Sequence, residues 1–456
     1  MSLPDIPALQ QYFASGETTS YSFRKLQLQK LRKAIEANEH AIMDALFNDL
    51  KKSPEEAYST EIGFVYSEIS NTLKHLQEWM QPVTVSSPLI IFPSSSKIIR
   101  DPLGVTLIIA PWNYPFQLVM APLIGSIAGG NCSVLKPSEF TPYTSAIIEK
   151  IIAEAFSLNY ITVATGNGAE VVPQLMKQYR FDHVFFTGSI PVGRQIALMA
   201  ADKLVPMTLE LGGKSPCIVD KDVNLKVAAQ RIAWGKFTNV GQTCVAPDYL
   251  LVHESRKNEL VEMLEKSVHQ YYGDDPLQSA DYGKIVNENR FNKLESFLSQ
   301  GSIVFGGETD KEKLYISPTL LKNVAETSPV MQEEIFGPIL PLYTFKDHQQ
   351  AIEMVRRMPN PLALYIFTNN AKVEKLYTEK ISFGGGCINN TLIHLANAEL
   401  PFGGVGNSGV GAYHGKFSFD TFTRQKSILK TSTWIDPLAK YPPYSGKLKI
   451  LKWLLK

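Results

Sequence analysis

Short apolar runs and amphipathic segments alternate along this chain from residue 101 onward. The apolar runs, such as "GVTLIIAP", "NCSVLKPSE", "YITVATG", "HVFFTGS" and "PMTLELGG", have the length and the β-branched content of buried strands. Segments with helical spacing of apolar residues lie among them, at 115–128, 141–156 and 190–204. Repeated units of this kind predict a parallel sheet that is covered by helices on both faces.

A second series of strand and helix patterns begins after residue 214. Its expected strands are "SPCIVD", "YLLVHES" and "LALYIFTN". A chain of 456 residues is long enough for roughly two to three domains. We therefore expect an α/β fold with two bodies. The expected helices of the second body are near 223–237, 255–271, 287–299, 348–358 and 371–380.

Other segments do not follow this alternation. Residues 20–50 and 55–80 carry amphipathic helical patterns. The stretch "QPVTVSSPLIIFPSSSKIIR" and the later "SFDTFTRQKSILKTS" are predicted to be extended strands outside the two bodies.

Composition excludes several classes of protein. The net charge of +1 gives no reason to expect nucleic acid as a partner. The N-terminal segment lacks the pattern of a signal peptide, and the most apolar stretch is short for a membrane span, so we expect a cytoplasmic protein. The four cysteines lie far apart and the histidines lack metal-ligand spacing, so no metal is expected.

Two glycine-rich loops are candidates for a phosphate-binding turn. The spacing G-x-G-x-x-G occurs at Gly404, Gly406 and Gly409, but neither a preceding strand nor a following helix is expected there, so we reject it. In "FTGSIPVGRQI" an apolar strand runs into Gly188 and Ser189, and a helix is expected to start near Gly193. Free amides at a helix start suit an anion such as pyrophosphate, although an ordinary turn fits equally well.

Six motifs, taken in order, closely resemble the NAD(P)-dependent aldehyde dehydrogenase superfamily. The resemblance extends over nearly the whole chain, and "GQTCVAPDY" and "PFGGVGNSGVGAYHGKFSFDTF" are most similar to the class 3 branch, which oxidises fatty and aromatic aldehydes. The six motifs are "APWNYPF" (110–116), "LKPSE" (135–139), "FTGSIPVG" (186–193), "LELGGKSP" (209–216), "GQTC" (241–244) and "EEIFGPILP" (333–341).

Cys244 is the candidate nucleophile. It sits in a polar Gly-Gln-Thr-Cys turn, and a thiolate is a strong nucleophile near neutral pH. Cys132 and Cys217 lie in strand-like runs and are expected to be inert core residues. For Cys387, in "GGGCINN", we favour packing as well.

Two polar residues complete the expected catalytic set. The resemblance implies that the side-chain amide of Asn113 and the backbone amide of Cys244 hold an oxyanion; a local Asx turn is the alternative for Asn113. Glu210 lies in an apolar segment, where desolvation raises the pKa of a carboxyl toward that of a general base. The resemblance implies that Glu210 activates water, and a structural ion pair is the alternative.

The resemblance also implies a nicotinamide cofactor. Lys136 and Glu139 would bind the adenosine ribose, and an acidic residue there favours NAD over NADP, although class 3 relatives often accept both. Glu334 and Phe336 match positions that bind the nicotinamide ribose. The full set of expected cofactor-binding residues is Trp112, Lys136, Glu139, Gly188, Ser189, Gly193, Glu334 and Phe336.

The implied reaction is oxidation of an aldehyde to a carboxylic acid with hydride transfer to NAD(P)+. A Cys244 thiohemiacetal would become a thioester, which water activated by Glu210 would hydrolyse. One alternative is a CoA-acylating aldehyde dehydrogenase, against which Glu210 argues. A cysteine hydrolase would need a histidine base that no residue near Cys244 in the sequence supplies. A binding protein on an inherited enzyme fold is a third alternative.

The resemblance finally implies a division of the chain and a homodimer. The expected division is 1–81 with 101–209 as a Rossmann-like NAD(P)-binding domain, 210–415 as the catalytic domain, 82–100 with 416–432 as bridging strands that join subunits, and 433–456 as the tail.

The C-terminal tail, "GKLKILKWLLK", is basic and apolar. We expect it to pack on the body, which is the commoner arrangement for such an end; weak attachment to anionic lipid is the alternative.

Overall fold

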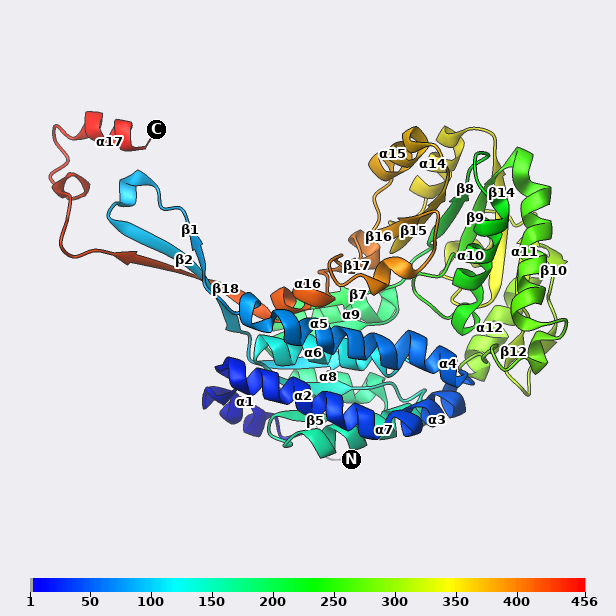
Figure 1. Ribbon diagram of the computed structural model, residues 1–456, viewed down its shortest axis with the longest axis horizontal. Helices are drawn as coiled ribbons and strands as arrows, with labels where there is room; N and C mark the ends of the chain where they lie inside the picture. The colour runs from blue at the N-terminus through cyan, green and yellow to red at the C-terminus, as the bar shows by residue number, and fades with distance from the viewer. Residues whose placement is uncertain (1–2, 456) are drawn as a thin grey trace.

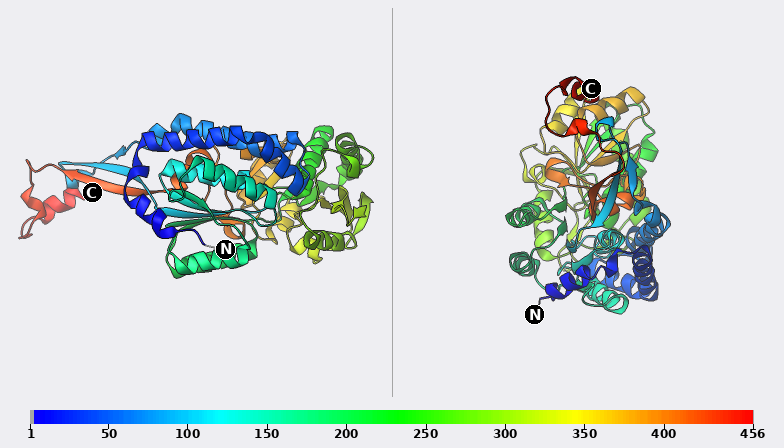
Figure 2. Two further views of the ribbon diagram at one scale, coloured as in Figure 1. Left: turned by 90° about the horizontal axis from the view of Figure 1, so that it is seen from below. Right: turned by 90° about the vertical axis from the view of Figure 1, so that its left-hand side faces the viewer.

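The computed structural model describes residues 3–455, which contain three larger β-sheets (Figure 1) and one short two-stranded sheet of β11 (Thr309–Asp310) and β12 (Tyr315–Ile316). Two of the sheets are covered by helices and form adjacent α/β bodies, and the third is an arm that projects from the first body (Figures 1 and 2). The predicted fold, two α/β bodies with an additional small β element, is confirmed.

The first sheet has six strands in the order β17-β7-β6-β3-β4-β5. All neighbours run parallel except β17 and β7. Strands β3, β4 and β6 are buried along their whole length, which explains their continuous apolar sequences. The strands are β3 (Val105–Ile109), β4 (Cys132–Lys136), β5 (Ile161–Val163), β6 (His183–Thr187), β7 (Met207–Glu210) and β17 (Gly409–Val410).

Helices cover both faces of this sheet (Figure 2). One face carries α6 (Gln117–Gly129), α7 (Pro142–Ala155) and the N-terminal helices, and the other carries α8 (Gly168–Gln178) and α9 (Ile190–Asp202). The sequence patterns did not indicate α8. The N-terminal helices are α1 (Ile6–Ala14), α2 (Tyr21–Ala37), α3 (Glu39–Leu50), α4 (Pro54–Ala57) and α5 (Gly63–Trp79), with one turn of π-helix at Tyr58–Ile62.

The order of connection reverses between β3 and β6. From β3 the chain proceeds to β4 and β5 in one direction, and it then returns to the other side of β3 for β6 and β7. Open α/β sheets bind ligands at the carboxyl ends of the strands beside such a reversal. The loops after β3 and β6 therefore mark the place for a site.

The second sheet has seven strands in the order β10-β13-β14-β9-β8-β15-β16, parallel except for the pair β10 and β13. The strands are β8 (Pro216–Val219), β9 (Tyr249–His253), β10 (Ser302–Phe305), β13 (Thr319–Lys322), β14 (Ile339–Phe345), β15 (Ala363–Phe367) and β16 (Gly385–Ile388). The longer helices of this body are α10 (Leu225–Phe237), α11 (Lys257–Tyr272), α12 (Glu288–Leu298), α14 (His348–Arg356) and α15 (Ala371–Lys380).

The arm is an antiparallel sheet in the order β1-β2-β18. Its strands are β1 (Val83–Val85), β2 (Ser94–Pro102) and β18 (Thr423–Thr431), and β18 pairs with β2 along its whole length. The two segments expected to be extended are therefore partners, although more than 300 residues separate them. The arm leaves apolar side chains exposed to solvent at Val83, Leu89, Phe92, Ile428 and Leu429.

The expectation that 418–432 is extended throughout is wrong for its first residues. Helix α16 (Gly415–Thr421) occupies them and packs against α5 and α6. Phe419 and Phe422 are fully buried there, so tertiary packing overrides the strand preference of a Phe- and Thr-rich segment.

The C-terminal tail follows the arm away from both α/β bodies (Figure 1). The expected packing of the tail on the body is therefore wrong. Its short helix α17 (Leu448–Leu454) and the segment before it leave Trp434 95% and Trp453 68% exposed. Within residues 3–455 no helix is both long and apolar enough to cross a membrane.

Candidate active site

The predicted site residues gather at the carboxyl ends of the first sheet and at loops of the second body. Trp112 and Asn113 follow β3, Gly188 follows β6, and Glu210 is the last residue of β7. Cys244 lies in a turn between α10 and β9. These residues therefore lie where the two bodies meet.

Asn113 joins the loop after β3 to the loop that carries Cys244. Its side chain is buried, and its Nδ2 donates a 3.0 Å hydrogen bond to the backbone carbonyl of Gln242. The hydroxyls of Tyr114 and Thr243 share a second, 2.6 Å hydrogen bond between the same loops. The Asn113 side chain thus links two loops by a hydrogen bond and does not form the local Asx turn considered as its alternative.

Cys244 differs from the other cysteines in its environment. Cys132 and Cys217 are buried strand residues, and burial raises their pKa values, to about 12 for Cys132. Cys244 is partly accessible and lies in a turn. Burial of the thiol and the nearby carboxyls of Glu334 and Glu210 raise the pKa of Cys244. A positive charge brought into this group would favour the thiolate.

The carboxyl of Glu210 is buried, and no hydrogen bond from the described residues offsets its loss of hydration. Neither carboxylate oxygen has a hydrogen-bond partner among the residues that the structure describes. Burial raises the pKa of Glu210 well above its ordinary value. The geometry does not support the structural ion pair considered as its alternative role, because no cation contacts it within residues 3–455.

Glu334 faces the same region from the loop before β14. Burial, reinforced by the Asp248 carboxylate and opposed by a hydrogen bond from the Gly213 amide, raises its pKa to about 8. A side chain at Gly212 would overlap the Glu334 carboxyl and displace it, so glycine at this position leaves room for the carboxyl. The "LELGG" motif therefore shapes the surroundings of both Glu210 and Glu334.

The expected cofactor residues form two groups. Trp112 and Phe336 meet edge to face with ring centroids 5.2 Å apart, although they are 224 positions apart in sequence. Lys136 Nζ is buried and lies 3.0 Å from Glu139 Oε2. Glu139 Oε1 accepts a 2.8 Å hydrogen bond from the Gly168 amide. This amide hydrogen bond and Lys136 lower the pKa of Glu139 against the effect of burial, so a carboxylate is held at this place.

Ser189 is the N-cap of α9, which begins at Ile190, three residues before the start expected near Gly193. In the described part of the chain its side chain makes no capping hydrogen bond, so first-turn amides of α9 remain available to an anion. The two glycines also pack closely within the protein. A side chain at Gly188 would overlap the Phe186 ring, and one at Gly193 would overlap the Leu211 side chain, so packing favours glycine at both positions in addition to the expected cofactor role.

The family of the chain follows from comparison with known proteins. Residues 6–428 match the model of the aldehyde dehydrogenase family. The chain belongs to this family. The match covers both α/β bodies and most of the arm.

Named relatives among the aldehyde dehydrogenases agree with a class 3-like branch. The chain is 50% identical over 447 residues to the 4,4'-diaponeurosporen-aldehyde dehydrogenase of Staphylococcus aureus, which covers 98% of this chain and 97% of the relative. It is 43% identical over 438 residues to the dimeric NADP-preferring aldehyde dehydrogenase of Rattus norvegicus, which covers 96% of each chain.

Solved aldehyde dehydrogenases have the same fold. The substrate-bound state of Staphylococcus aureus AldH superposes with a TM-score of 0.97 at 49% identity, covering 99% of this chain and 98% of that one. The NAD-dependent aldehyde dehydrogenase of Sinorhizobium meliloti superposes with a TM-score of 0.86 at 29% identity, covering 95% of this chain and 87% of that one.

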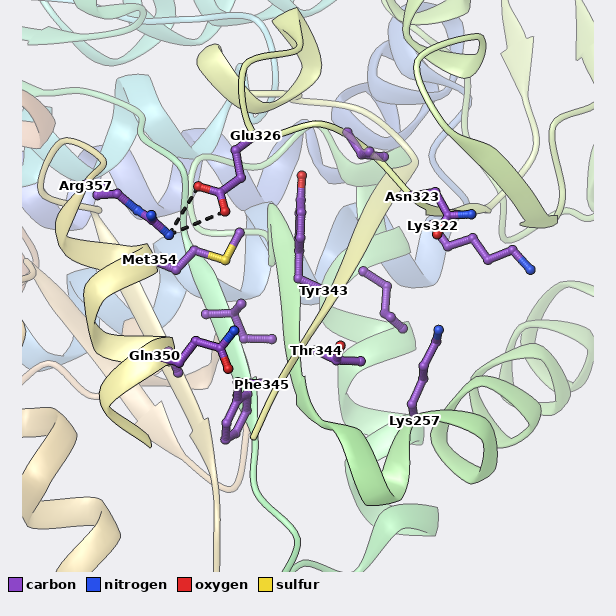
Figure 3. Close-up of a pocket in the computed structure, with 14 residues that line it drawn as sticks. Lys257, Lys322, Asn323, Glu326, Tyr343, Thr344, Phe345, Gln350, Met354 and Arg357 are labelled. Atoms are coloured by element: carbon purple, nitrogen blue, oxygen red, sulfur yellow. Dashed lines mark hydrogen bonds and ion pairs between the residues drawn. The ribbon is translucent and has the colours of Figure 1, made fainter. Parts of the chain in front are cut away.

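A separate cavity of about 290 Å³ opens in the second body of this aldehyde dehydrogenase (Figure 3). Residues of β14, the end of β13 and α14 line it, with the Arg357–Glu326 ion pair at one side. The predicted catalytic and cofactor residues are not among its lining residues. Within residues 3–455 no group of three or more His, Cys, Asp or Glu side chains could hold a metal ion.

Proposed function

We propose that this aldehyde dehydrogenase oxidises a medium- or long-chain aliphatic or an aromatic aldehyde to the acid through a covalent Cys244 intermediate. The observation that carries the mechanism is the placement of Glu210, a buried carboxyl without a hydrogen-bond partner in the described chain, close enough to Cys244 to raise the pKa of its thiol. Similarity to a dehydrogenase named for a diaponeurosporen-aldehyde supports a large apolar substrate.

The first step is attack of Cys244 Sγ on the aldehyde carbon. The thiolate forms a carbon–sulfur bond, and the carbonyl oxygen becomes an oxyanion. One N–H of the Asn113 amide is held by Gln242, which leaves the second N–H of the same nitrogen for the oxyanion, together with the Cys244 backbone amide. A donor of this kind contributes about 100- to 1000-fold in rate.

The second role belongs to Glu210. The adduct would become a thioester when its hydride is lost to the bound cofactor. The raised pKa of Glu210 makes it a stronger base toward water, and the hydroxide so formed displaces the Cys244 thiolate from the thioester as the acid leaves. Because its carboxyl is unpaired, that proton transfer does not require an existing ion pair to break.

The chain's own residues fit a nicotinamide dinucleotide, with NAD as the expected cofactor and NADP as an alternative. Lys136 and Glu139 offer an ammonium and a carboxylate to ribose hydroxyls, and α9 offers amides to a pyrophosphate. When bound, the oxidised nicotinamide supplies the hydride acceptor and a positive charge. The residues that would hold it are Trp112, Lys136, Glu139, Gly188, Ser189, Gly193, Glu334 and Phe336.

We further propose that the enzyme is a homodimer in which the arm joins two subunits. The arm projects from its body with apolar side chains exposed, and a relative at 43% identity is named as dimeric. In this proposal residues 1–81 and 101–209 form the cofactor domain and 210–415 the catalytic domain. Strand β17 nevertheless pairs with β7 of the first sheet.

As a second proposal, we infer that the C-terminal tail attaches weakly to anionic lipid. An exposed tryptophan beside lysines on a short apolar helix, as Trp453 is on α17, is typical of segments that lie in a lipid interface. Deletion of residues 446–456 is expected to abolish sedimentation with phosphatidylserine vesicles and to leave the dimer intact. Unchanged sedimentation, or a change to monomers, would contradict this proposal.

The test of the reaction is reduction of NAD or NADP measured by absorbance with a panel of aliphatic and aromatic aldehydes. We expect turnover without coenzyme A and loss of turnover in Cys244→Ala. Turnover that requires coenzyme A would favour the acylating alternative. Ester hydrolysis without any reduction of cofactor would favour the cysteine hydrolase.

A further inference from the structure

A fully buried ion pair lies at the N-terminus of α6, and the proposed mechanism does not use it. Lys52 Nζ is 2.6 Å from Glu61 Oε1, and both side chains are completely buried. The other oxygen of Glu61 accepts hydrogen bonds of 2.8 and 3.1 Å from the Phe116 and Gln117 amides. A buried ion pair adds little net stability because both charges lose their hydration. Any role of the Lys52–Glu61 pair beyond stability must therefore come from the other contacts that the two side chains make.

Lys52 reaches the proposed oxyanion residue directly. Its Nζ donates a 3.1 Å hydrogen bond to the backbone carbonyl of Asn113 and lies 4.1 Å from the ring centroid of Tyr114. The Asn239 side chain donates a second hydrogen bond of 2.8 Å to the same carbonyl. A carbonyl oxygen has two lone pairs, so both are occupied and the Asn113 backbone is fixed from two sides.

Hydrogen bonds among Asn113, Asn239 and Gln242 form a closed ring that includes the Asn113 side-chain amide, the proposed oxyanion donor. Asn239 Nδ2 bridges the carbonyls of Asn113 and Gln242, and Asn113 Nδ2 donates to Gln242. Asn239 and Val240 adopt φ of 51° and 56°, a conformation that costs non-glycine residues about 1–3 kcal/mol each. Glu61 itself belongs to the π-helical turn, a local irregularity that is frequent at functional sites.

We propose that Lys52 and Glu61 are positioning residues for the oxyanion donor. Glu61 holds the start of α6 and orients Lys52, and Lys52 holds the Asn113 carbonyl, which sets the direction of the Asn113 amide toward Cys244. This inference rests on the proposed function, in which that amide binds the oxyanion. A displacement of about 1 Å at such a donor lowers the rate about 100-fold.

The test is a double-mutant cycle on acylation of Cys244. A chromogenic acetate ester acylates the thiol without cofactor, and its single-turnover rate reports on the oxyanion donor alone. Lys52→Met, which keeps the length of the side chain, is expected to lower this rate about 10- to 100-fold. In the Asn113→Ala background the same substitution is expected to cost less than about threefold, because the group through which Lys52 acts is gone.

Equal losses in the two backgrounds, or an unchanged rate in Lys52→Met, would overturn the proposal. If Lys52→Met does not fold, Lys52→Arg tests the same step. A guanidinium in a fully buried space cannot keep both the Glu61 and the Asn113 distances, so the same cycle result is expected.

Arg24 provides a matched control at the other end of the same helix. It is a buried cation whose Nη1 donates a 2.9 Å hydrogen bond to the carbonyl of Ala128, near the end of α6. Arg24→Met should lower thermal stability as Lys52→Met does and leave the acylation rate unchanged. An equal loss of rate in Arg24→Met would show a merely structural role for Lys52. Failure of the wild type to reduce NAD(P) would instead refute the proposed function, and the ester cycle would still decide the role of Lys52.

Discussion

Gly409 pairs with Glu210 in the antiparallel ladder between β17 and β7. The glycine-rich turn that carries the misleading G-x-G-x-x-G spacing thus lies against the backbone of the buried carboxylate. A side chain at Gly409 would overlap the carbonyl of Leu209, and its φ of 159° lies at the edge of the region that favours glycine. The spacing reflects close approach of two backbones near the site rather than a dinucleotide loop.

Gly409→Ala should therefore affect Glu210 specifically. The added methyl pushes on β7, so we expect a loss of about 1–3 kcal/mol of stability and a slower release of the acyl group from Cys244. Gly16→Ala is the control, because Gly16 also has a positive φ but open space around it. It should lose stability without a change in deacylation. Equal deacylation rates in the two variants would contradict this role of Gly409.

Removal of the Cys244 thiol should abolish both cofactor reduction and ester hydrolysis. Cys244→Ala is expected to lower both by more than about 1000-fold, because no other group in the mechanism forms the covalent bond. Cys387→Ser is the matched control, since Cys387 is likewise only partly buried. Stopped-flow absorbance measures the reduction, and inactivation by Cys387→Ser would contradict the assignment of the nucleophile.

Glu210→Gln should separate acylation from hydrolysis. The amide cannot accept a proton from water, so we expect one equivalent of reduced cofactor per site, followed by turnover about 100- to 10,000-fold slower than in the wild type. Glu68 is a matched control, because it is also buried and its pKa is raised to about 7 by burial. Glu68→Gln should keep steady turnover. Quenched-flow measurement of the burst checks both, and absence of a burst would refute the division of roles.

Strands were predictable from the sequence where they are buried on both faces of the sheet. Sequences such as "GVTLIIAP" appear as continuous apolar runs because β3 has no exposed residue. Strand β14, "ILPLYTF", and helix α8 were missed. Each contains a proline, Pro341 in β14 and Pro173 in α8, which weakens the local strand or helix preference. Packing against neighbouring elements, rather than local preference, fixes these two elements.

The roles of Asn113 and Glu210 were predicted from the family resemblance, and their proximity is explained by topology. Asn113 follows β3 and Glu210 ends β7, so the fold brings both to the same edge of the sheet. Lys52 and Glu61 could not be predicted, because a charged residue between two expected helices, such as Lys52, or within an amphipathic helical pattern, such as Glu61, normally faces solvent. Their burial depends on α6 and on the loop after β3, which lie far away in the sequence.

Glu139→Gln should shift cofactor preference toward NADP. In the proposed site the carboxylate beside Lys136 would repel a 2′-phosphate, and the amide would keep an acceptor for the Gly168 N–H. We expect the ratio of kcat/KM for NADP to that for NAD to rise roughly tenfold, which corresponds to about 1.4 kcal/mol. Glu170→Gln, an exposed carboxylate in the first turn of α8, is the control. An unchanged ratio in Glu139→Gln would show that this carboxylate does not face the 2′ position.

Glu334 should make the protein less stable as pH rises from about 4.5 to about 8. Its pKa is raised from 4.5 to about 8 in the folded protein, chiefly by burial, so in this window the unfolded chain ionises Glu334 while the folded protein retains the proton. Each pH unit then favours unfolding by up to about 1.4 kcal/mol, and the loss is complete above the folded pKa.

Glu334→Gln should remove this part of the pH dependence while other titrating groups, Glu210 included, remain in both proteins. The melting temperature of wild type minus that of the variant should be constant below pH 4, fall between pH 5 and 8, and level off above. Thermal unfolding followed by circular dichroism across this range measures the difference. A difference that is the same at every pH would mean that Glu334 is ionised in the folded protein, stabilised by the Gly213 amide and nearby cations more strongly than burial opposes it.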